Sequence, residues 1–588
     1  MTAAPGIPEF GSASLSRRQI ASSVLILLLV TWFGNFFEFE HFTLYSDDWA
    51  FLGQVFKAPY TFATWVDSLI PYADGRPIQS GLIVLTGVII NQTHRLIAAY
   101  LFAYVVAQLS VLAVWRALAY RFSNRLALIA ACVFAISPLV SIRPFLNNIA
   151  APASFLFLMV AGILYISGRR IFSYVVAALI LLSYEMIFPL FALLPALLRP
   201  LRTRRDLYRL FGHIAICLVM LVIYALLRGK YGSSRLNGVM AGHDAGEIAL
   251  GILSAIGESI IDGSIGSIDI SLWWHRIGPV PTALTIWGIL GVAGFAYILH
   301  RSEIEAEEAT RDPRLMLQTL AIVLLLVPAA YALVYFGASD GAQSVFGRVS
   351  RFHEAADLPL AILTAMILLG LLDLAGRSRW RHAVIAIEAG YLGLLFALSV
   401  SHQEEFVAAS ERQRLLVTQL AMDQPRMDPD ATFIIRLPYL DAAHLPSIDY
   451  DDGHAYYFIL RDLFDFRDRS GRPGPAIRIV YDDKWPERLT PGPDGRLYWP
   501  AGTWPAEPEQ AGHIWYYAFS VAGELQRLSG PVMVGGRDIL HEGGDADPGA
   551  VDLAALTKSR YYPLIMGRDA ALVDMALRPS APVEPPTN

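Results

Sequence analysis

Two neighbouring carboxylates, Asp47 and Asp48, stand in a short polar segment after the first apolar run of the chain. The aromatic residues that follow, from Trp49 to Trp65, are typical of a segment lying at a membrane interface. An acidic pair is thereby placed just above the lipid surface. Because adjacent side chains on a helix do not face each other, we expect one of the two to act and the other to support it. The simpler alternative is that both are solvated residues at a helix end.

The segment Asp74-Gly75-Arg76-Pro77 stands where the next apolar run begins. Asp74 can cap a helix there, and proline is well tolerated in a first helical turn. The exposed N–H groups of a helix start favour anions, and an arginine beside them adds a bidentate clamp for phosphate. Arg76 is therefore either part of an ordinary helix start or part of an anion-binding site.

A third candidate, Ser183-Tyr184-Glu185, is embedded in apolar sequence. A carboxylate inside a membrane is costly, so we expect Glu185 to face a cavity or a charged partner. Further charged residues stand at the edges of later apolar runs: Arg143, Arg348, Arg351, His353 and Glu354. A ring of arginines and acids at a bilayer edge suits a lipid phosphate, whereas each group taken alone fits a solvated flank.

A membrane domain must position these residues. Of 588 residues, 55% are hydrophobic and 17% are charged, whereas soluble domains carry about a quarter charged residues. Eleven apolar runs are long enough to enter or cross a bilayer: 20–37, 77–91, 94–118, 123–139, 150–167, 171–199, 207–228, 281–300, 314–337, 356–375 and 383–400. We therefore predict an α-helical polytopic membrane protein with about eleven transmembrane helices and a membrane domain at 19–400.

Positive charges predict the orientation. Arg17 and Arg18 place residues 1–18 in the cytoplasm, and three arginine-rich loops agree with this: 199–209, 301–314 and 377–382. The segments expected on the outer side are the loops 38–76, 229–280 and 338–355 and everything after 400. The region 77–199 stays open. Either 77–91 enters without crossing and 171–199 crosses twice, or each crosses once.

The composition changes after the last apolar run. A helix is expected at 403–424, and Pro, Gly, Asp and aromatic residues become frequent from about 425. Strands are predicted at Thr432–Leu437, Ala476–Tyr481, Ile514–Phe519 and Val532–Gly535. We expect an extracytoplasmic soluble α/β domain at 401–578, followed by a disordered tail at 579–588.

Several functions are disfavoured. The net charge of −6 argues against a nucleic-acid partner. The two cysteines, Cys132 and Cys217, lie inside apolar runs and form no metal motif. Asp449-Tyr450-Asp451 spells the DxD of nucleotide-sugar enzymes, but no glycine-rich strand–helix turn precedes it.

The residues described first carry a resemblance. Asp47-Asp48-Trp49, Gly75-Arg76-Pro77 and Ser183-Tyr184-Glu185 resemble features of the GT-C superfamily of membrane glycosyltransferases, in particular a group resembling O-antigen glucosyltransferases. The resemblance covers the general architecture and roughly residues 1–200. The region after 425 matches no family in this way.

The resemblance implies sugar transfer from a polyprenyl-phosphate sugar at the outer face of a bacterial inner membrane, to a glycan, lipid or protein acceptor. Asp47 would be the general base, with Asp48 and Glu185 completing the catalytic set. The donor phosphate would be bound by four arginines: Arg76, Arg143, Arg348 and Arg351. The supporting residues would be Asp74, Tyr184 and His353. Members of the superfamily differ in their need for a metal, and Asp47 and Asp48 are the candidates to hold Mg²⁺ or Mn²⁺.

Two other classes explain part of the pattern. A transporter or lipid flippase would use the buried charged residues as a substrate path, but it predicts an internal repeat that the sequence does not show. A non-enzymatic assembly protein would act through its C-terminal domain.

Overall fold

The structure is a computed structural model of the chain. It describes residues 15–45, 48, 51–52, 65–66, 70, 73, 75–93, 95–137, 139–140, 142–230, 245–261, 282–301, 313–337, 347–376, 379–423, 432–436, 476–480, 484–494, 496–499, 509–510, 514–520, 524–528 and 531–540. The chain divides into two compact units. The first comprises Met1–Phe39, Pro59–Leu85 and Tyr100–Glu404, and the second comprises Glu40–Ala58, Thr86–Ala99 and Glu405–Asn588.

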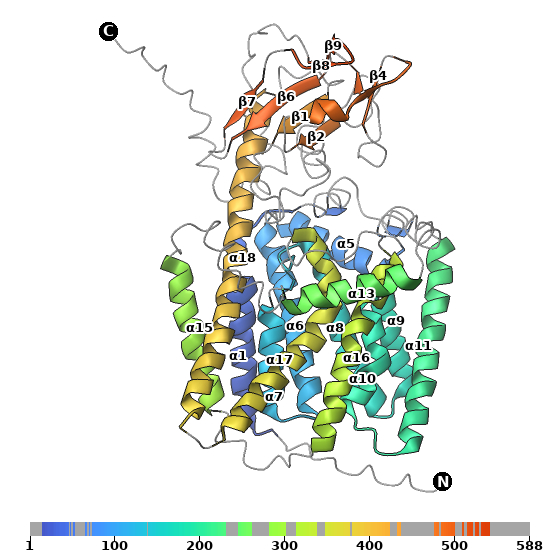
Figure 1. Cartoon of the computed structure of the whole chain (residues 1–588), viewed down its shortest axis with the longest axis vertical. Helices are drawn as coiled ribbons and strands as arrows, with labels where there is room; N and C mark the ends of the chain where they lie inside the picture. Colours follow the sequence, from blue (N-terminus) through green and yellow to red (C-terminus); the bar gives the residue numbers. More distant parts are fainter. Residues whose placement is uncertain are drawn as a thin grey trace. The chain divides into compact units, whose positions relative to one another are not determined.

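The first unit is a bundle of helices that run mostly side by side, with α13 lying across its neighbours (Figure 1). Its α-helices are α1 (Arg17–Asn35), α6 (Leu96–Ala119, from Tyr100), α7 (Asn124–Ile136), α8 (Ala150–Ile166), α9 (Arg170–Ser183), α10 (Phe188–Leu198), α11 (Arg204–Lys230), α13 (Ala245–Ile260), α15 (Thr282–Arg301), α16 (Pro313–Gly337) and α17 (Glu354–Ala375). Short 3-10 helices precede three of the helices: η3 (Leu146–Ile149), η4 (Glu185–Ile187) and η7 (Gly347–His353). Helices α5 (Pro77–Thr93) and α18 (Arg381–Asp423) contribute to both units.

Seven of the described helices are long and apolar enough to cross a membrane: α1, α6, α8, α11, α16, α17 and α18. Five shorter apolar helices accompany them: α7, α9, α10, α13 and α15. A polytopic helical architecture therefore agrees with the prediction, whereas the predicted count of about eleven spans is not established. Helix α13 was not predicted, because residues 229–280 were expected to form an outer loop.

The apolar run 171–199 forms two helices, in agreement with the alternative that divided this run in two, and the number of crossings stays a prediction. Helix α9 ends at Ser183, and Tyr184 leaves the helical region with φ −143° and ψ 89°. Helix α10 then begins at Phe188 with Pro189 in its first turn. Proline fits a first helical turn, and it has no N–H to donate to the carbonyl of Glu185, four residues before it, so Pro189 favours a new helix start. The break places the backbone of Tyr184 and Glu185 between the two helices.

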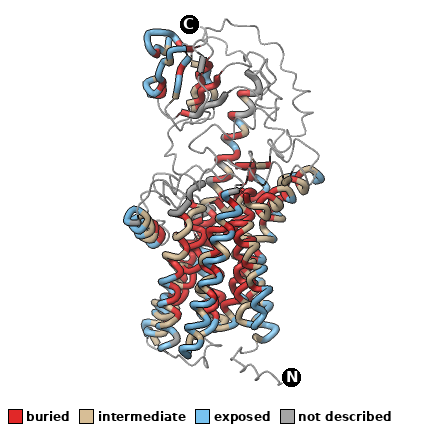
Figure 2. Tube along the Cα trace, turned by 90° about the vertical axis from the view of Figure 1, so that its right-hand side faces the viewer, coloured by how far each residue is buried: buried red, intermediate tan, exposed pale blue. Residues whose placement is uncertain are grey.

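Packing in the first unit depends on small residues and on polar contacts between helices. Buried residues gather on the inward sides of the helices (Figure 2). Gly393 of α18 lies so close to α15 that a Cβ atom there would stand 2.7 Å from the backbone N of Val292. Such close approach is typical of helix packing in lipid, where van der Waals contact replaces the hydrophobic effect. Two hydrogen bonds add to it: Asn35 Nδ2 donates to the Ala135 carbonyl at 2.7 Å, and Ser399 Oγ donates to the Gly34 carbonyl at 2.7 Å.

The second unit contains the predicted β-structure. A four-stranded sheet has the order β2-β1-β6-β7, with β1 parallel to β2 and β6. The strands of the unit are β1 (Thr432–Arg436), β2 (Ala476–Val480), β3 (Thr490–Pro491), β4 (Arg496–Tyr498), β5 (Glu509–Gln510), β6 (Ile514–Phe519), β7 (Leu525–Arg527), β8 (Met533–Val534) and β9 (Arg537–Asp538). Strands β1, β2 and β6 confirm three predictions to within one residue, and β8 covers part of the fourth.

Both faces of the central strands are buried, as a parallel sheet requires. Phe433 pairs with Trp515 on one face. Ile434 pairs with Tyr516 on the other face, in a cluster around Trp485 of the 3-10 helix η10 (Trp485–Arg488). Strands β1 and β6 are therefore nearly continuous apolar runs, and this explains why they could be recognised from the sequence.

Helix α18 runs without a break across residue 400, where the sequence predicted the end of the membrane domain. In the second unit, α18 forms hydrogen bonds with the segment that follows α1. The Tyr45 hydroxyl donates to the Phe406 carbonyl at 3.1 Å and lies 2.7 Å from Ser410 Oγ. Burial raises the pKa of the Tyr45 phenol, and the hydrogen bond with Ser410 opposes that shift only in part, so the hydroxyl stays protonated.

Tyr45→Phe should loosen this segment. The change removes a hydroxyl from a fully buried site and leaves Ser410 with one partner fewer, which costs about 1 kcal/mol. We expect faster amide hydrogen exchange in a peptide covering 41–45. Tyr208→Phe, on an exposed side chain of α11, is the matched control and should leave that peptide unchanged. Equal exchange in wild type and Tyr45→Phe would show that the hydroxyl does not hold the segment.

Candidate functional site

Glu185 lies at the centre of a buried ionic cluster in the first unit. Arg76 donates to it in a bidentate manner, from Nε to Oε2 at 2.7 Å and from Nη2 to Oε1 at 2.6 Å. Arg228 Nη1 donates to Glu185 Oε1 at 2.6 Å, and the Tyr224 hydroxyl donates to Oε2 at 3.5 Å. The two arginine side chains and the glutamate side chain are 8–13% exposed. The prediction that Glu185 faces a charged partner is confirmed.

Local structure brings these groups together. Gly75, with φ 78°, adopts the left-handed conformation that favours glycine, and the backbone turns there into α5. Arg76 immediately precedes α5, and its Nη1 also donates to Gln79 Oε1 at 3.3 Å in the first turn. Arg228 stands in the last turn of α11, at the end of the apolar run that the sequence predicted as a span. The break after α9 supplies Glu185.

Among the described residues, two arginines surround one carboxylate. Arg76 and Arg228 each contact Glu185. A guanidinium has five N–H donors, and the contacts of Arg76 to Glu185 and Gln79 use three of them. Arg76 thus keeps donors for a ligand. Buried ion pairs are strong where water is excluded, so Glu185 fixes both arginines in place.

Tyr184 connects this cluster with η7. The Arg76 guanidinium lies 5.8 Å from the centre of the Tyr184 ring, and the Tyr184 hydroxyl donates to the Arg351 carbonyl at 3.2 Å. Tyr184 thus contacts both the Glu185 cluster and η7. The supporting role that the resemblance implies for it stays a prediction. Arg351 is half-buried and borders the start of α17.

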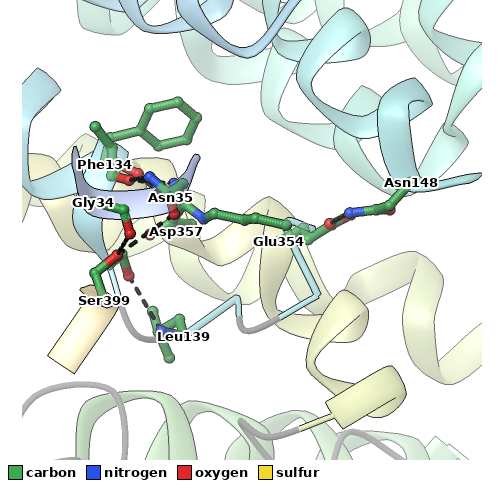
Figure 3. Close-up of polar contacts among 11 residues, drawn as sticks. Gly34, Asn35, Phe134, Leu139, Asn148, Glu354, Asp357 and Ser399 are labelled. Carbon is green, nitrogen blue, oxygen red and sulfur yellow. Dashed lines mark hydrogen bonds and ion pairs between the residues drawn. The ribbon is translucent and has the colours of Figure 1, made fainter. Parts of the chain in front are cut away.

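Arg143 belongs to a second cluster. Its Nη2 donates to Asp357 Oδ2 at 2.8 Å and to the Phe134 carbonyl at 2.8 Å, and its Nη1 donates to the Ala135 carbonyl at 2.6 Å. Asn148 Nδ2 donates to Glu354 Oε1 close by (Figure 3). Arg143 thus caps the end of α7 and is neutralised by Asp357 of α17.

His353 is fully buried in a third group of residues. Its Nδ1 lies 2.8 Å from the Tyr331 hydroxyl and 3.1 Å from Ser259 Oγ, and these two hydroxyl groups also contact each other. The residues come from η7, α16 and α13. This network connects α13 with α16 and η7, so His353 has a packing function. The supporting role that the resemblance implies for it stays a prediction.

Other predicted site residues are only partly visible. Asp47 and Asp74 lie outside the described residues, and so does the side chain of Arg348. Asp48 belongs to the second unit, where it is fully buried and its Oδ2 accepts a hydrogen bond from the Tyr45 N–H at 3.2 Å. Among the residues that the structure describes, no group of three or more His, Cys, Asp or Glu could hold a metal ion. The proposed metal pair of Asp47 and Asp48 is therefore not tested.

Two residues of these clusters were missed from the sequence. Arg228 closes an apolar run on the predicted outer side, and Asp357 stands just inside the run 356–375. A charged residue at the end of an apolar run is costly without a partner. This cost could have indicated that both residues pair with opposite charges.

The chain was compared with protein families, curated proteins and solved structures. No protein family and no curated protein matches the chain. Among solved structures, it is similar to an oligosaccharyltransferase of Archaeoglobus fulgidus, solved tethered through a disulfide bond to an acceptor peptide containing the NVT sequon. The TM-score is 0.31 and the identity is 14%, over 74% of this chain and 63% of the archaeal chain. The chain thus spans less than two thirds of that protein's length, and a likeness at this TM-score establishes neither fold nor function.

Glu185→Gln should destabilise the protein strongly. Removing the shared carboxylate charge leaves two buried guanidinium groups without their counter-ion, and breaking a buried pair costs about 3–5 kcal/mol. We expect a clear fall in the midpoint of thermal unfolding of the purified protein in detergent. Glu411→Gln, on an exposed side chain of α18, should leave the midpoint unchanged. An unchanged midpoint for Glu185→Gln would mean that Glu185 does not hold the two arginines.

Proposed function

We propose that the protein is a membrane glycosyltransferase that moves a sugar from a polyprenyl-phosphate donor to a glycan, lipid or protein acceptor at the outer face of a bacterial inner membrane. The observation that carries the proposal is the Arg76–Glu185–Arg228 cluster. It is a buried site in which two arginines contact one described carboxylate, beside the start of α5, in a unit rich in apolar helices. A lipid-linked phosphate matches both the charge and the apolar surroundings.

The arginine contacts refine the set predicted from the sequence. Arg76 and Arg228 are the proposed donor-phosphate ligands, since Glu185 orients both and they outnumber it in charge. Arg143 is a weaker candidate, because Asp357 and two backbone carbonyls already bind its guanidinium. Arg348 and Arg351 remain proposed ligands from the resemblance. In this proposal Glu185 positions arginines and does not itself transfer a proton.

The chemistry proposed for the reaction follows from these assignments. The acceptor hydroxyl attacks the anomeric carbon of the donor sugar, and Asp47 takes the hydroxyl proton as general base. The bond between the anomeric carbon and the phosphate oxygen breaks, through a transition state with oxocarbenium character. The electron pair of that bond leaves with the polyprenyl phosphate, and Arg76 and Arg228 stabilise the added negative charge.

Asp48 has a supporting role in this proposal. Its carboxylate accepts a hydrogen bond from the Tyr45 backbone and its side chain is fully buried, which favours holding the segment beside Asp47 over contacting substrate. A Mg²⁺ or Mn²⁺ ion at Asp47 remains a proposal from the resemblance. If such an ion is present, it would be expected to polarise the phosphate oxygens.

A transfer assay tests the proposal. Purified protein in liposomes is given a panel of radiolabelled polyprenyl-phosphate sugars and an acceptor extract. We expect transfer by the wild type, none by Asp47→Asn, and a fall in kcat of about 100-fold for Arg228→Gln, as for loss of one electrostatic stabiliser. Arg205→Gln, an exposed arginine of α11, should behave as wild type.

The other outcomes separate the alternatives. Equal transfer by wild type and Asp47→Asn would keep the enzyme class and reject Asp47 as the base. Absence of transfer, together with movement of the labelled lipid between leaflets, would contradict the enzyme and favour a transporter or flippase that uses the same buried charges.

A further inference from the structure

A cavity of about 70 Å³ lies in the first unit among α1, α6, α7, α8 and α17. Its walls are mostly apolar and include the aromatic rings of Phe134, Phe145 and Phe155. Water-sized groups need about 10–15 Å³ each by this kind of measure, so the space holds on the order of five of them. That is room for one edge of a small ring and not for a lipid chain.

The polar lining of the cavity includes Asn148, Glu354 and Asp357, which Figure 3 labels. Arg143 also lines it, as do Thr31, Asn35 and Ser110. Two carboxyl groups and one guanidinium thus line this side of the cavity. The Arg143 guanidinium is engaged by Asp357 and by two carbonyl groups. The cavity is therefore unsuited to a phosphate.

Glu354 has hydrogen-bonding capacity that the described residues do not use. It is 3% exposed, and while Oε1 accepts a hydrogen bond from Asn148, Oε2 has no partner among the described residues. A buried oxygen in this state is costly unless a ligand or water donates to it. The Asn148 amide group has a second N–H, so the pair offers an acceptor and a donor side by side.

We propose that this cavity binds one edge of a pyranose sugar. Hydroxyl groups of a sugar both donate and accept, so neighbouring hydroxyls can bond to Glu354 and Asn148 together. The C–H face of the ring would pack against the phenylalanine rings, which makes a mostly apolar pocket with a few convergent polar groups. A purely apolar ligand would leave the second oxygen of Glu354 without a hydrogen-bond partner.

The proposal rests on the proposed function, because it gives the sugar a place beside the phosphate site. Tyr184 contacts Arg76 through its ring, and its hydroxyl donates to the Arg351 carbonyl, three residues before Glu354. The two sites thus border the same η7–α17 junction. The bound ring could be the donor sugar or the terminal sugar of the acceptor.

Saturation-transfer NMR tests the inference without requiring turnover. The full chain in nanodiscs is mixed in turn with methyl glycosides of glucose, galactose, mannose and N-acetylglucosamine, and with propylammonium as a competing class. We expect saturation of the ring protons of at least one glycoside. Glu354→Gln should weaken its Kd about tenfold, as for loss of a charge-assisted bond.

Two further variants distinguish loss of glycoside binding from misfolding. Ala107→Phe fills the cavity while keeping every polar group, and it should also weaken glycoside binding about tenfold or more. Glu388→Gln makes the same chemical change at a buried carboxylate that does not line the cavity, and it should bind as wild type. No saturation of any glycoside, binding of propylammonium alone, or equal glycoside binding by Ala107→Phe would overturn the proposal.

The transfer assay then separates the two sources of the sugar. Glu354→Gln should raise KM for the donor if the donor sugar occupies the cavity, and KM for the acceptor if the acceptor sugar does. Glycoside binding without transfer by the wild type would contradict the proposed function and keep the cavity proposal. Transfer without glycoside binding would keep the proposed function and contradict the cavity proposal.

Discussion

The cost of placing charge in an apolar bundle governs this structure. Glu185 could not remain ionised in its position without a counter-ion, and it binds two, Arg76 and Arg228. Among the described residues, two arginines thus share one carboxylate, which holds them in place away from bulk water. A flexible arginine at a membrane surface would have to lose side-chain freedom when it binds an anion, whereas these two are already ordered.

The same constraint explains the neighbouring clusters. Arg143 is matched by Asp357, Glu354 by Asn148, and His353 by Ser259 and Tyr331. Tyr184 stands at the break between α9 and α10 and connects the Glu185 cluster with η7. The arginine-rich Glu185 cluster and the mostly apolar cavity lined by Glu354 therefore border the same η7–α17 junction. A sugar attached to a phosphate presents that combination: a charged group and a neutral hydroxylated ring.

Much of the fold was predictable because its signals are local. The long apolar runs specify helices, and the short apolar and aromatic run at Ile514–Phe519 specifies a strand. Pro189 provided a signal for the break after Ser183 that was not used. Glu185 could be identified as a costly carboxylate, but its partner Arg228 could not, since the pairing depends on how α11 packs beside η4. Arg143 was predicted as a phosphate ligand from its place at an edge, and only the packing of α17 shows that Asp357 binds it.

The central claim is that the Arg76–Glu185–Arg228 cluster recognises a lipid-linked phosphate. Binding of polyprenyl phosphate and of the corresponding polyprenol to the full chain, measured by native mass spectrometry, tests it directly. The account predicts that the phosphate binds at least about tenfold more tightly, and that Arg76→Gln removes most of this difference. Equal affinity for phosphate and alcohol in the wild type, or a preference unchanged in Arg76→Gln, would contradict it.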